Sequence, residues 1–139
     1  MMTPPDEESR VAKGMAEASI DRTPNDVWNI VRDFGGVANY MSGIESCTLD
    51  GEVRTIHMMG IEVKEQLREL DDDTRRISYS VIESPMTNMI SHLATIGVDA
   101  EGGGTHFTWD VEVEPDELLP LFQGVYEQSV VALKEKLES

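Results

Sequence analysis

The sequence has one cysteine, few basic residues and no long apolar stretch. Because Cys47 is the single cysteine in 139 residues, no disulfide can form within the chain. A lone thiol is typical of proteins in a reducing compartment, so we predict a cytoplasmic location. The absence of any long apolar run argues against a signal peptide and against a membrane-spanning helix.

Positive charge is also scarce. The chain has 11 Lys and Arg against 27 Asp and Glu, a formal net charge of −16. Its longest basic run is Arg75-Arg76. Nucleic acids and anionic membrane surfaces are bound through positive patches, so we predict neither as a partner. The acidity favours solubility instead.

Length and composition indicate one domain. Residues 1–12 are polar and contain Pro4-Pro5, which predicts a disordered tail. Residues 13–139 contain no internal repeat or linker, and their number suffices to bury a core without disulfides or metals. The oligomeric state does not follow from the sequence.

Apolar periodicity divides this domain into strands and helices. A strand at about 14–21 is followed by Thr23-Pro24-Asn25-Asp26, which has the cap, proline and acid of a helix start. Gly35-Gly36 is expected to end that helix, and a second short helix is expected at about 37–41. A long amphipathic helix is predicted over 115–137. Six further strands are predicted at 44–50, 53–59, 61–70, 75–83, 87–100 and 104–113.

Short connections between these strands predict an antiparallel sheet. Seven strands and one long amphipathic helix make an α+β fold, in which the helix covers the apolar face of the sheet. A curved sheet leaves a hollow beneath such a helix, where a ligand can bind.

Arg54 and Glu65 fall on the apolar side of one predicted hairpin. With a turn at Met59-Gly60, position 54 directly faces position 65. An inward ion pair is costly to bury, so it predicts either a structural pair or the polar end of a cavity. Tyr79 lies on the same face provided that the loop after Leu70 has three or five residues, because four would reverse the register.

The sequence resembles the START-related helix-grip superfamily, often labelled SRPBCC, and its polyketide cyclase/dehydratase-like branch. The resemblance covers about residues 14–137. It is carried by ASIDRTPNDVWNIVRDF, by VRTIHMMGIEVKEQLRELDDDTRRISYSVIESPMT and by THFTWDVEV. It implies a helix-grip fold with two short helices between strands 1 and 2. Members often have an Arg and a Glu where this chain has Arg54 and Glu65, and lachrymatory factor synthase is thought to use such a pair near its substrate. Relatives usually have a longer glycine-rich segment before this Arg. Here only Gly51-Glu52 precedes Val53-Arg54, so the connection between strands 2 and 3 is shorter.

We therefore predict a protein that binds a small hydrophobic or amphipathic molecule between sheet and helix. The alternative is a cofactor-independent cyclase, dehydratase or isomerase, in which Arg54 stabilises an oxygen and Glu65 moves a proton. A third interpretation is a module that binds another protein. No cofactor is predicted, and the three histidines lack the spacing of metal ligands. Methionines can give the cavity an adaptable lining. The predicted ligand-binding residues are Arg54, Met58, Glu65, Tyr79, His92, Trp109, Phe122 and Tyr126, although the direction of His92 is undecided because its strand is apolar on both faces.

Overall fold

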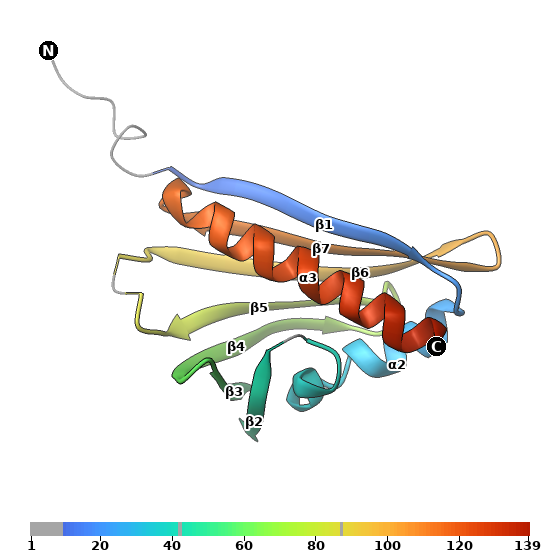
Figure 1. The fold of residues 1–139 in the computed structure, drawn as a ribbon, viewed down its shortest axis with the longest axis horizontal. Coiled ribbons are helices and arrows are strands. Elements are labelled where there is room, and N and C mark those ends of the chain that lie inside the picture. The colour runs from blue at the N-terminus through green and yellow to red at the C-terminus, as the bar shows by residue number, and fades with distance from the viewer. Residues whose placement is uncertain (1–9, 42, 87) are drawn as a thin grey trace, which may run out of the picture.

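The computed structural model describes residues 10–41, 43–86 and 88–139. Figure 1 shows a long helix lying along a broad sheet. The elements, in chain order, are β1 (Ala12–Ile20), α2 (Pro24–Val31), the 3-10 helix η1 (Phe34–Asn39), β2 (Ile44–Asp50), β3 (Val53–Met58), β4 (Ile61–Asp71), β5 (Arg76–Glu83), β6 (Ser91–Glu101), β7 (Gly104–Glu114), the 3-10 turn η2 (Asp116–Leu118) and α3 (Leu119–Glu138).

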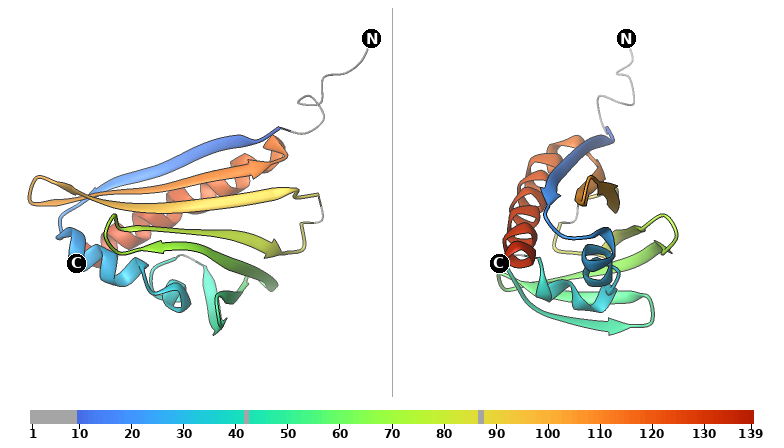
Figure 2. Two further views of the ribbon diagram at one scale, coloured as in Figure 1. Left: turned by 180° about the vertical axis from the view of Figure 1, so that it is seen from behind. Right: turned by 90° about the vertical axis from the view of Figure 1, so that its right-hand side faces the viewer.

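The seven strands form one antiparallel sheet in the order β1-β7-β6-β5-β4-β3-β2. The sheet curves around α3, as the end-on view in Figure 2 shows. The predicted α+β fold, with its curved sheet and long C-terminal helix, is confirmed. The disordered tail predicted for residues 1–12 lies mostly outside the described residues, and Ala12 already belongs to β1.

Helix α2 begins where the sequence predicts. The Thr23 side chain caps it by accepting a hydrogen bond from the Asp26 backbone N–H at 3.2 Å. The predicted end at Gly35-Gly36 is wrong, because α2 stops at Val31 and both glycines lie in η1. The second short helix is therefore a 3-10 helix that starts three residues before the predicted 37. Phe34 and Val37 of η1 are buried in the core.

The β3–β4 hairpin has the predicted turn and register. Met59 and Gly60 both have positive φ angles, 50° and 77°, as a two-residue hairpin turn requires. Arg54 pairs directly with Glu65 across the two strands. The inward direction of both side chains is confirmed by their burial, at 1% and 7% exposure.

In the β4–β5 hairpin, Tyr79 lies on the same face as Glu65, as predicted, but the loop length differs from the prediction. Asp71 pairs with Arg76, so the loop has four residues, and the prediction of three or five is wrong. A β-bulge between Leu67 and Glu69 inserts one extra residue and restores the register, which pairs Leu67 with Tyr79. The bulge also bends β4, in keeping with the curvature of the sheet.

Strand β6 begins four residues later than predicted. Residues 88–90 are not strand, because residues 88 and 89 belong to a turn in which the Met89 backbone N–H reaches the Met86 carbonyl at 3.5 Å. Residue 87, where the strand was predicted to begin, lies outside the described residues. The β5–β6 ladder extends only to the pair Tyr79–Ala94, so the two strands separate beyond it.

Helix α3 presents one continuous apolar side to the sheet. Its first predicted turn is the 3-10 turn η2, and the α-helix itself starts at Leu119. The expected stripe is buried against strands that include β1 and β7. Its buried members are Phe122, Tyr126, Ser129, Val130, Leu133 and Leu137.

Candidate functional site

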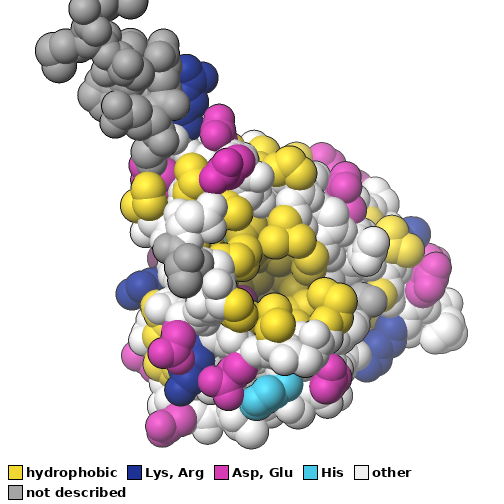
Figure 3. Space-filling view, turned by 60° about the vertical axis from the view of Figure 1, so that its left-hand side comes forward, with side chains coloured by type: hydrophobic (Ala, Val, Ile, Leu, Met, Phe, Trp, Pro, Cys, Tyr) yellow, Lys and Arg dark blue, Asp and Glu magenta, His cyan; other side chains and the backbone are white. Residues whose placement is uncertain are grey.

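A cavity of about 100 Å³ lies between the sheet and the N-terminal half of α3. Figure 3 shows a hollow rimmed by hydrophobic side chains at this end of the molecule. Met59, Ile61 and Leu121 form part of the wall and are themselves 75%, 38% and 52% exposed, so the cavity opens to solvent beside them. The full lining consists of Met41, Met58, Met59, Ile61, Val63, Glu65, Val81, Met86, Leu121, Phe122, Val125 and Tyr126.

The lining is apolar apart from two oxygen-bearing side chains, Glu65 and Tyr126. Four of the eight methionines of the chain contribute to it. Methionine has three rotatable bonds and a polarisable sulfur, so it adapts to the shape of a neighbour. The wall is therefore deformable, and its polar groups are few and fixed.

Arg54 lies behind this cavity and holds Glu65 in place. Its Nε donates to Glu65 Oε1 at 2.8 Å, and its Nη2 lies 2.7 Å from the same oxygen. Its Nη1 donates to the Phe34 carbonyl at 2.9 Å. The guanidinium carbon also lies 4.0 Å and 4.5 Å from the ring centres of Phe34 and Tyr79. Arg54 is thus fully engaged by the protein.

One of the two carboxylate oxygens of Glu65 has no contact with Arg54. Both contacts with Arg54 use Oε1, and no donor in the described part of the chain reaches Oε2. Burial raises the pKa of the Glu65 carboxyl above its ordinary value, and the Arg54 charge opposes that rise. Glu65, a residue of the cavity wall, therefore has a carboxylate oxygen that is free to accept a hydrogen bond.

Tyr126, the other polar residue of the lining, is held by hydrogen bonds and ring contacts with aromatic side chains. Trp109 Nε1 donates to the Tyr79 hydroxyl at 3.2 Å, and that hydroxyl donates to Tyr126 at 3.2 Å. His92 Nε2 lies 3.0 Å from the same Tyr126 oxygen. The Trp109 and Tyr126 rings stack with centres 4.6 Å apart and an interplanar angle of 14°. These contacts fix the position of Tyr126, whose side chain lines the cavity.

His92 fills the gap where β5 and β6 separate. Its Nδ1 accepts the Val81 backbone N–H at 3.1 Å, which supplies the partner that the sheet ladder no longer provides. Because Nδ1 is an acceptor, the proton of the neutral ring lies on Nε2. Burial lowers the pKa of His92 to about 4, so the ring is neutral at pH 7.

The predicted ligand-binding residues fall into two groups. Met58, Glu65, Phe122 and Tyr126 line the cavity. The other four form a layer behind it and touch the lining residues through the contacts above: Arg54, Tyr79, His92 and Trp109. Their role toward a ligand stays a prediction.

Eight lining residues were not named as ligand-binding. Met41, Met59 and Met86 belong to the methionines that the sequence offers for an adaptable wall. Leu121 and Val125 lie beside Phe122 on the turns of α3, one step away from the stripe that the periodicity selects. Ile61, Val63 and Val81 complete the set, and their alternation with polar residues predicts burial but not a cavity.

The described residues contain no cluster of three or more His, Cys, Asp or Glu side chains arranged to hold a metal ion. No helix in residues 10–41, 43–86 or 88–139 has the length and hydropathy needed to cross a membrane.

The chain belongs to the family described as polyketide cyclase/dehydrase and lipid transport, which matches residues 12–138. This match confirms the predicted membership of the START-related helix-grip superfamily. No curated protein matches the chain.

Solved structures share the fold over nearly the whole chain. The protein XoxI from Bacillus cereus is similar with a TM-score of 0.86 and 25% identity, over 92% of this chain and 96% of that one. Norcoclaurine synthase from Thalictrum flavum, a point mutant in complex with a transition-state analogue, has a TM-score of 0.76 and 15% identity, over 93% and 95%. Ara h 8.0201 has a TM-score of 0.73 and 14% identity, over 91% and 97%. At identities of 14% and 15%, the last two comparisons establish the fold alone.

Proposed function

We propose that the protein binds a small, mainly apolar molecule in the cavity between the sheet and α3. The observation that carries this proposal is an apolar, methionine-rich wall that includes Glu65, whose Oε2 has no donor in the described part of the chain. Ligand sites are typically apolar concavities with a few convergent polar groups. The description of the family, which includes lipid transport, supports the same function.

The size of the cavity sets a condition on binding. A volume of about 100 Å³ holds on the order of three water molecules. Ligand sites commonly have about 300–1,000 Å³. An organic ligand therefore enters only when lining methionines change rotamer, which makes their methyl groups sensitive reporters of binding.

NMR of protein labelled with ¹³C at the methionine methyl groups tests the proposal. We expect saturable shifts of Met58 and Met86 when toluene, 1-hexanol, 2-hexanone or hexanoate is added singly. Met15, which lies at the groove between β1 and α3, is the internal control. Shifts that do not saturate for any of the four probes would contradict the proposal.

Two matched variants locate the binding site. Val125→Phe places a ring in the cavity and should abolish the saturable shifts. Val131→Phe is the same change on the same helix, at a position 55% exposed and outside the cavity, and should leave them intact. Equal effects of the two variants would place binding elsewhere.

The alternative function, a cofactor-independent enzyme that moves a proton, is favoured by one observation. Glu65 combines a free Oε2 at the cavity with a raised pKa, which is what a general base needs. Arg54 supports this alternative less, because its donors already serve Glu65 and Phe34. The same titration distinguishes the two functions, since loss of the α-proton signals of 2-hexanone in D₂O would identify proton abstraction.

A further inference from the structure

The Trp109–Tyr79–Tyr126–His92 chain has one more polar hydrogen than it has contacts. Each of its four side chains contributes one, because His92 must carry its proton on Nε2. Three contacts join the four groups, and each uses one hydrogen. One hydroxyl hydrogen is therefore left to point outside the chain.

The surplus hydrogen belongs to Tyr126. Tyr79 donates to Tyr126, and His92 Nε2–H donates to the same oxygen. Both lone pairs of the Tyr126 hydroxyl are then occupied, and its own O–H must find another acceptor. Within the described residues no further acceptor contacts it. Tyr126 lines the cavity and Tyr79 does not, so the cavity is the space from which a ligand can supply the missing acceptor.

Glu65 Oε2 provides an acceptor at the same cavity. The Glu65 side chain is 91% buried, given its 9% exposure, and lacks a donor on Oε2. No hydrogen bond joins Glu65 to Tyr126 among the described residues, although both line one wall. A donor and an acceptor thus face one small space without satisfying each other.

We propose that this pair of groups selects a neutral hydroxyl as the polar head of the ligand: an alcohol, a phenol or an enol. The ligand oxygen accepts from Tyr126 O–H, and the ligand O–H donates to Glu65 Oε2. This inference rests on the proposed function and specifies the ligand class for the same cavity.

Other head groups leave part of the site unsatisfied. A ketone accepts from Tyr126 but donates nothing to Glu65. A carboxylate is repelled by the Glu65 charge, and Arg54 has no free face for it because its donors and ring contacts are occupied. An ammonium group pairs with Glu65 but cannot accept from Tyr126. Among these head groups a hydroxyl alone satisfies both Tyr126 and Glu65 at once.

Affinities of probes with matched chains test the head-group preference. We expect 1-hexanol to bind most tightly, 2-hexanone about fivefold more weakly and hexanoate at least about tenfold more weakly, as one lost hydrogen bond or one charge repulsion implies. Binding of hexanoate or 2-hexanone as tight as that of 1-hexanol would overturn this inference and leave the proposed function standing. Failure of all probes, including toluene, would instead contradict the proposed function.

Tyr126→Phe tests the donor directly. It keeps the ring that stacks on Trp109 and removes only the hydroxyl. We expect about a tenfold loss of affinity for 1-hexanol and no change for toluene. Thr105→Val removes another buried hydroxyl, which donates to the Arg22 carbonyl at 2.8 Å outside the cavity, and should leave both affinities unchanged. A loss for toluene equal to that for 1-hexanol would contradict a role of the hydroxyl in recognition.

Discussion

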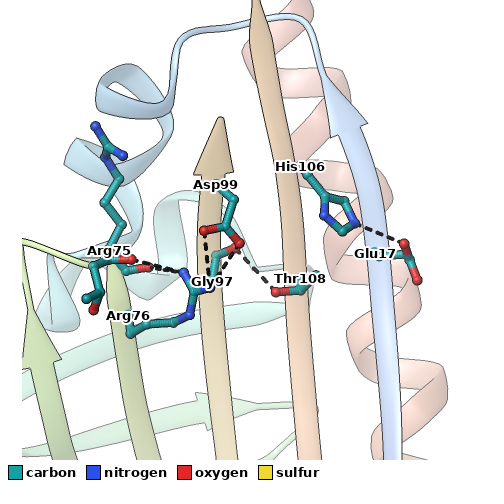
Figure 4. A network of polar contacts seen from close by, with 8 residues as sticks. Glu17, Arg75, Arg76, Gly97, Asp99, His106 and Thr108 are labelled. Carbon is teal, nitrogen blue, oxygen red and sulfur yellow. Dashed lines mark hydrogen bonds and ion pairs between the residues drawn. The ribbon is translucent and has the colours of Figure 1, made fainter. Parts of the chain in front are cut away.

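Two arginine–carboxylate pairs join neighbouring strands of this sheet, one on each face. On the inner face Arg54 and Glu65 approach to 2.7 Å, with side-chain exposures of 2% and 9%. On the outer face Arg76 and Asp99 approach to 2.9 Å, with exposures of 35% and 47%. Figure 4 shows this second pair on the side of the sheet away from α3. The contact distances are nearly equal, and the surroundings differ completely.

The difference lies in what replaces water. Around Arg54 the protein supplies a carbonyl and two aromatic rings, and Glu65 borders the cavity. Around Arg76 the guanidinium lies over Gly97, and solvent still reaches both charged groups. Removing one partner of a buried pair leaves the other charge unpaired and without hydration. Removing one partner of an exposed pair leaves the other charge in contact with water. Burial, rather than distance, sets the energetic importance of each pair.

The largest effect is expected when the inner pair is broken. Arg54→Met and Glu65→Gln should each lower the free energy of unfolding by about 3–5 kcal/mol, and the double variant should recover much of that loss. Urea denaturation at pH 7 measures all four proteins. Losses below about 1 kcal/mol in both single variants would show that cavity water hydrates the pair and that its role is functional.

The two single variants should respond differently to pH. Arg54→Met leaves a buried carboxyl that can take up a proton, whereas Glu65→Gln leaves a guanidinium that cannot lose one. Without Arg54 nothing opposes the effect of burial on the pKa of Glu65, so the folded pKa lies above the unfolded value. Stability of Arg54→Met should therefore be greatest at low pH and fall as the pH rises through that pKa.

How much of this contrast follows from the sequence depends on periodicity. Alternation and the Met59-Gly60 turn predict the inward pairing of Arg54 with Glu65. A slip of one residue would turn every side chain of the strand to the other face, so the apolar face allows a single register. The bulge that restores the facing of Tyr79 has no glycine to mark it and depends on the curvature of the whole sheet. The direction of His92 depends on where β5 and β6 separate, which no local pattern encodes.

The cavity itself was predictable in place but not in extent. A helix over a curved sheet implies a hollow, and four of the eight predicted ligand-binding residues line it. The division into a lining and a supporting layer is set by side-chain packing between distant strands. Trp109 illustrates this division. Alternation predicts that its side chain points inward, but the Tyr126 ring stacks on it, and Trp109 is not among the lining residues.

The inner and outer faces of the sheet also differ in the pKa of a histidine, and therefore in how stability depends on pH. Burial lowers the pKa of His92 to about 4, whereas Glu17, 3.0 Å from His106, raises the pKa of His106 on the outer face. His92 therefore contributes stability above pH 6.5 that is lost as the pH falls from about 6.5 to about 4, by about 3 kcal/mol. His106 contributes stability that is present below pH 6.5 and lost as the pH rises through its folded pKa.

NMR titration of the two imidazole rings should give one pKa below and one above 6.5. In urea denaturation, His92→Gln should make the loss of stability between pH 7 and pH 4.5 smaller than in the natural protein. His106→Gln should lower stability at pH 5.5 and have little effect at pH 8. A shift of both histidines in the same direction would contradict the contrast between inner and outer faces.

The smallest effect is expected when the outer pair is broken. Asp99→Asn should lower the free energy of unfolding by only about 0.2–1 kcal/mol, because both partners are partly hydrated already. The difference from the natural protein should shrink further in 1 M salt, where charges are screened within about 3 Å. A loss near that of Glu65→Gln would mean that distance, not burial, controls these pairs.

Gly97→Ala is the steric counterpart of that test, since it displaces Arg76 without removing a charge. A Cβ at Gly97 would lie 3.0 Å from Arg76 Cζ and 2.8 Å from Thr108 Oγ1. Thr108 Oγ1 would have to move, and the guanidinium would have to shift by a few tenths of an ångström, which weakens its contacts to Asp99. Because the moving atoms end a flexible, solvated side chain, we expect a change no larger than that of Asp99→Asn. In the double variant the two losses should add only in part, because both changes weaken the same Arg76–Asp99 contact. Additive losses in urea denaturation would show that Gly97 serves packing of the strands independently of the ion pair.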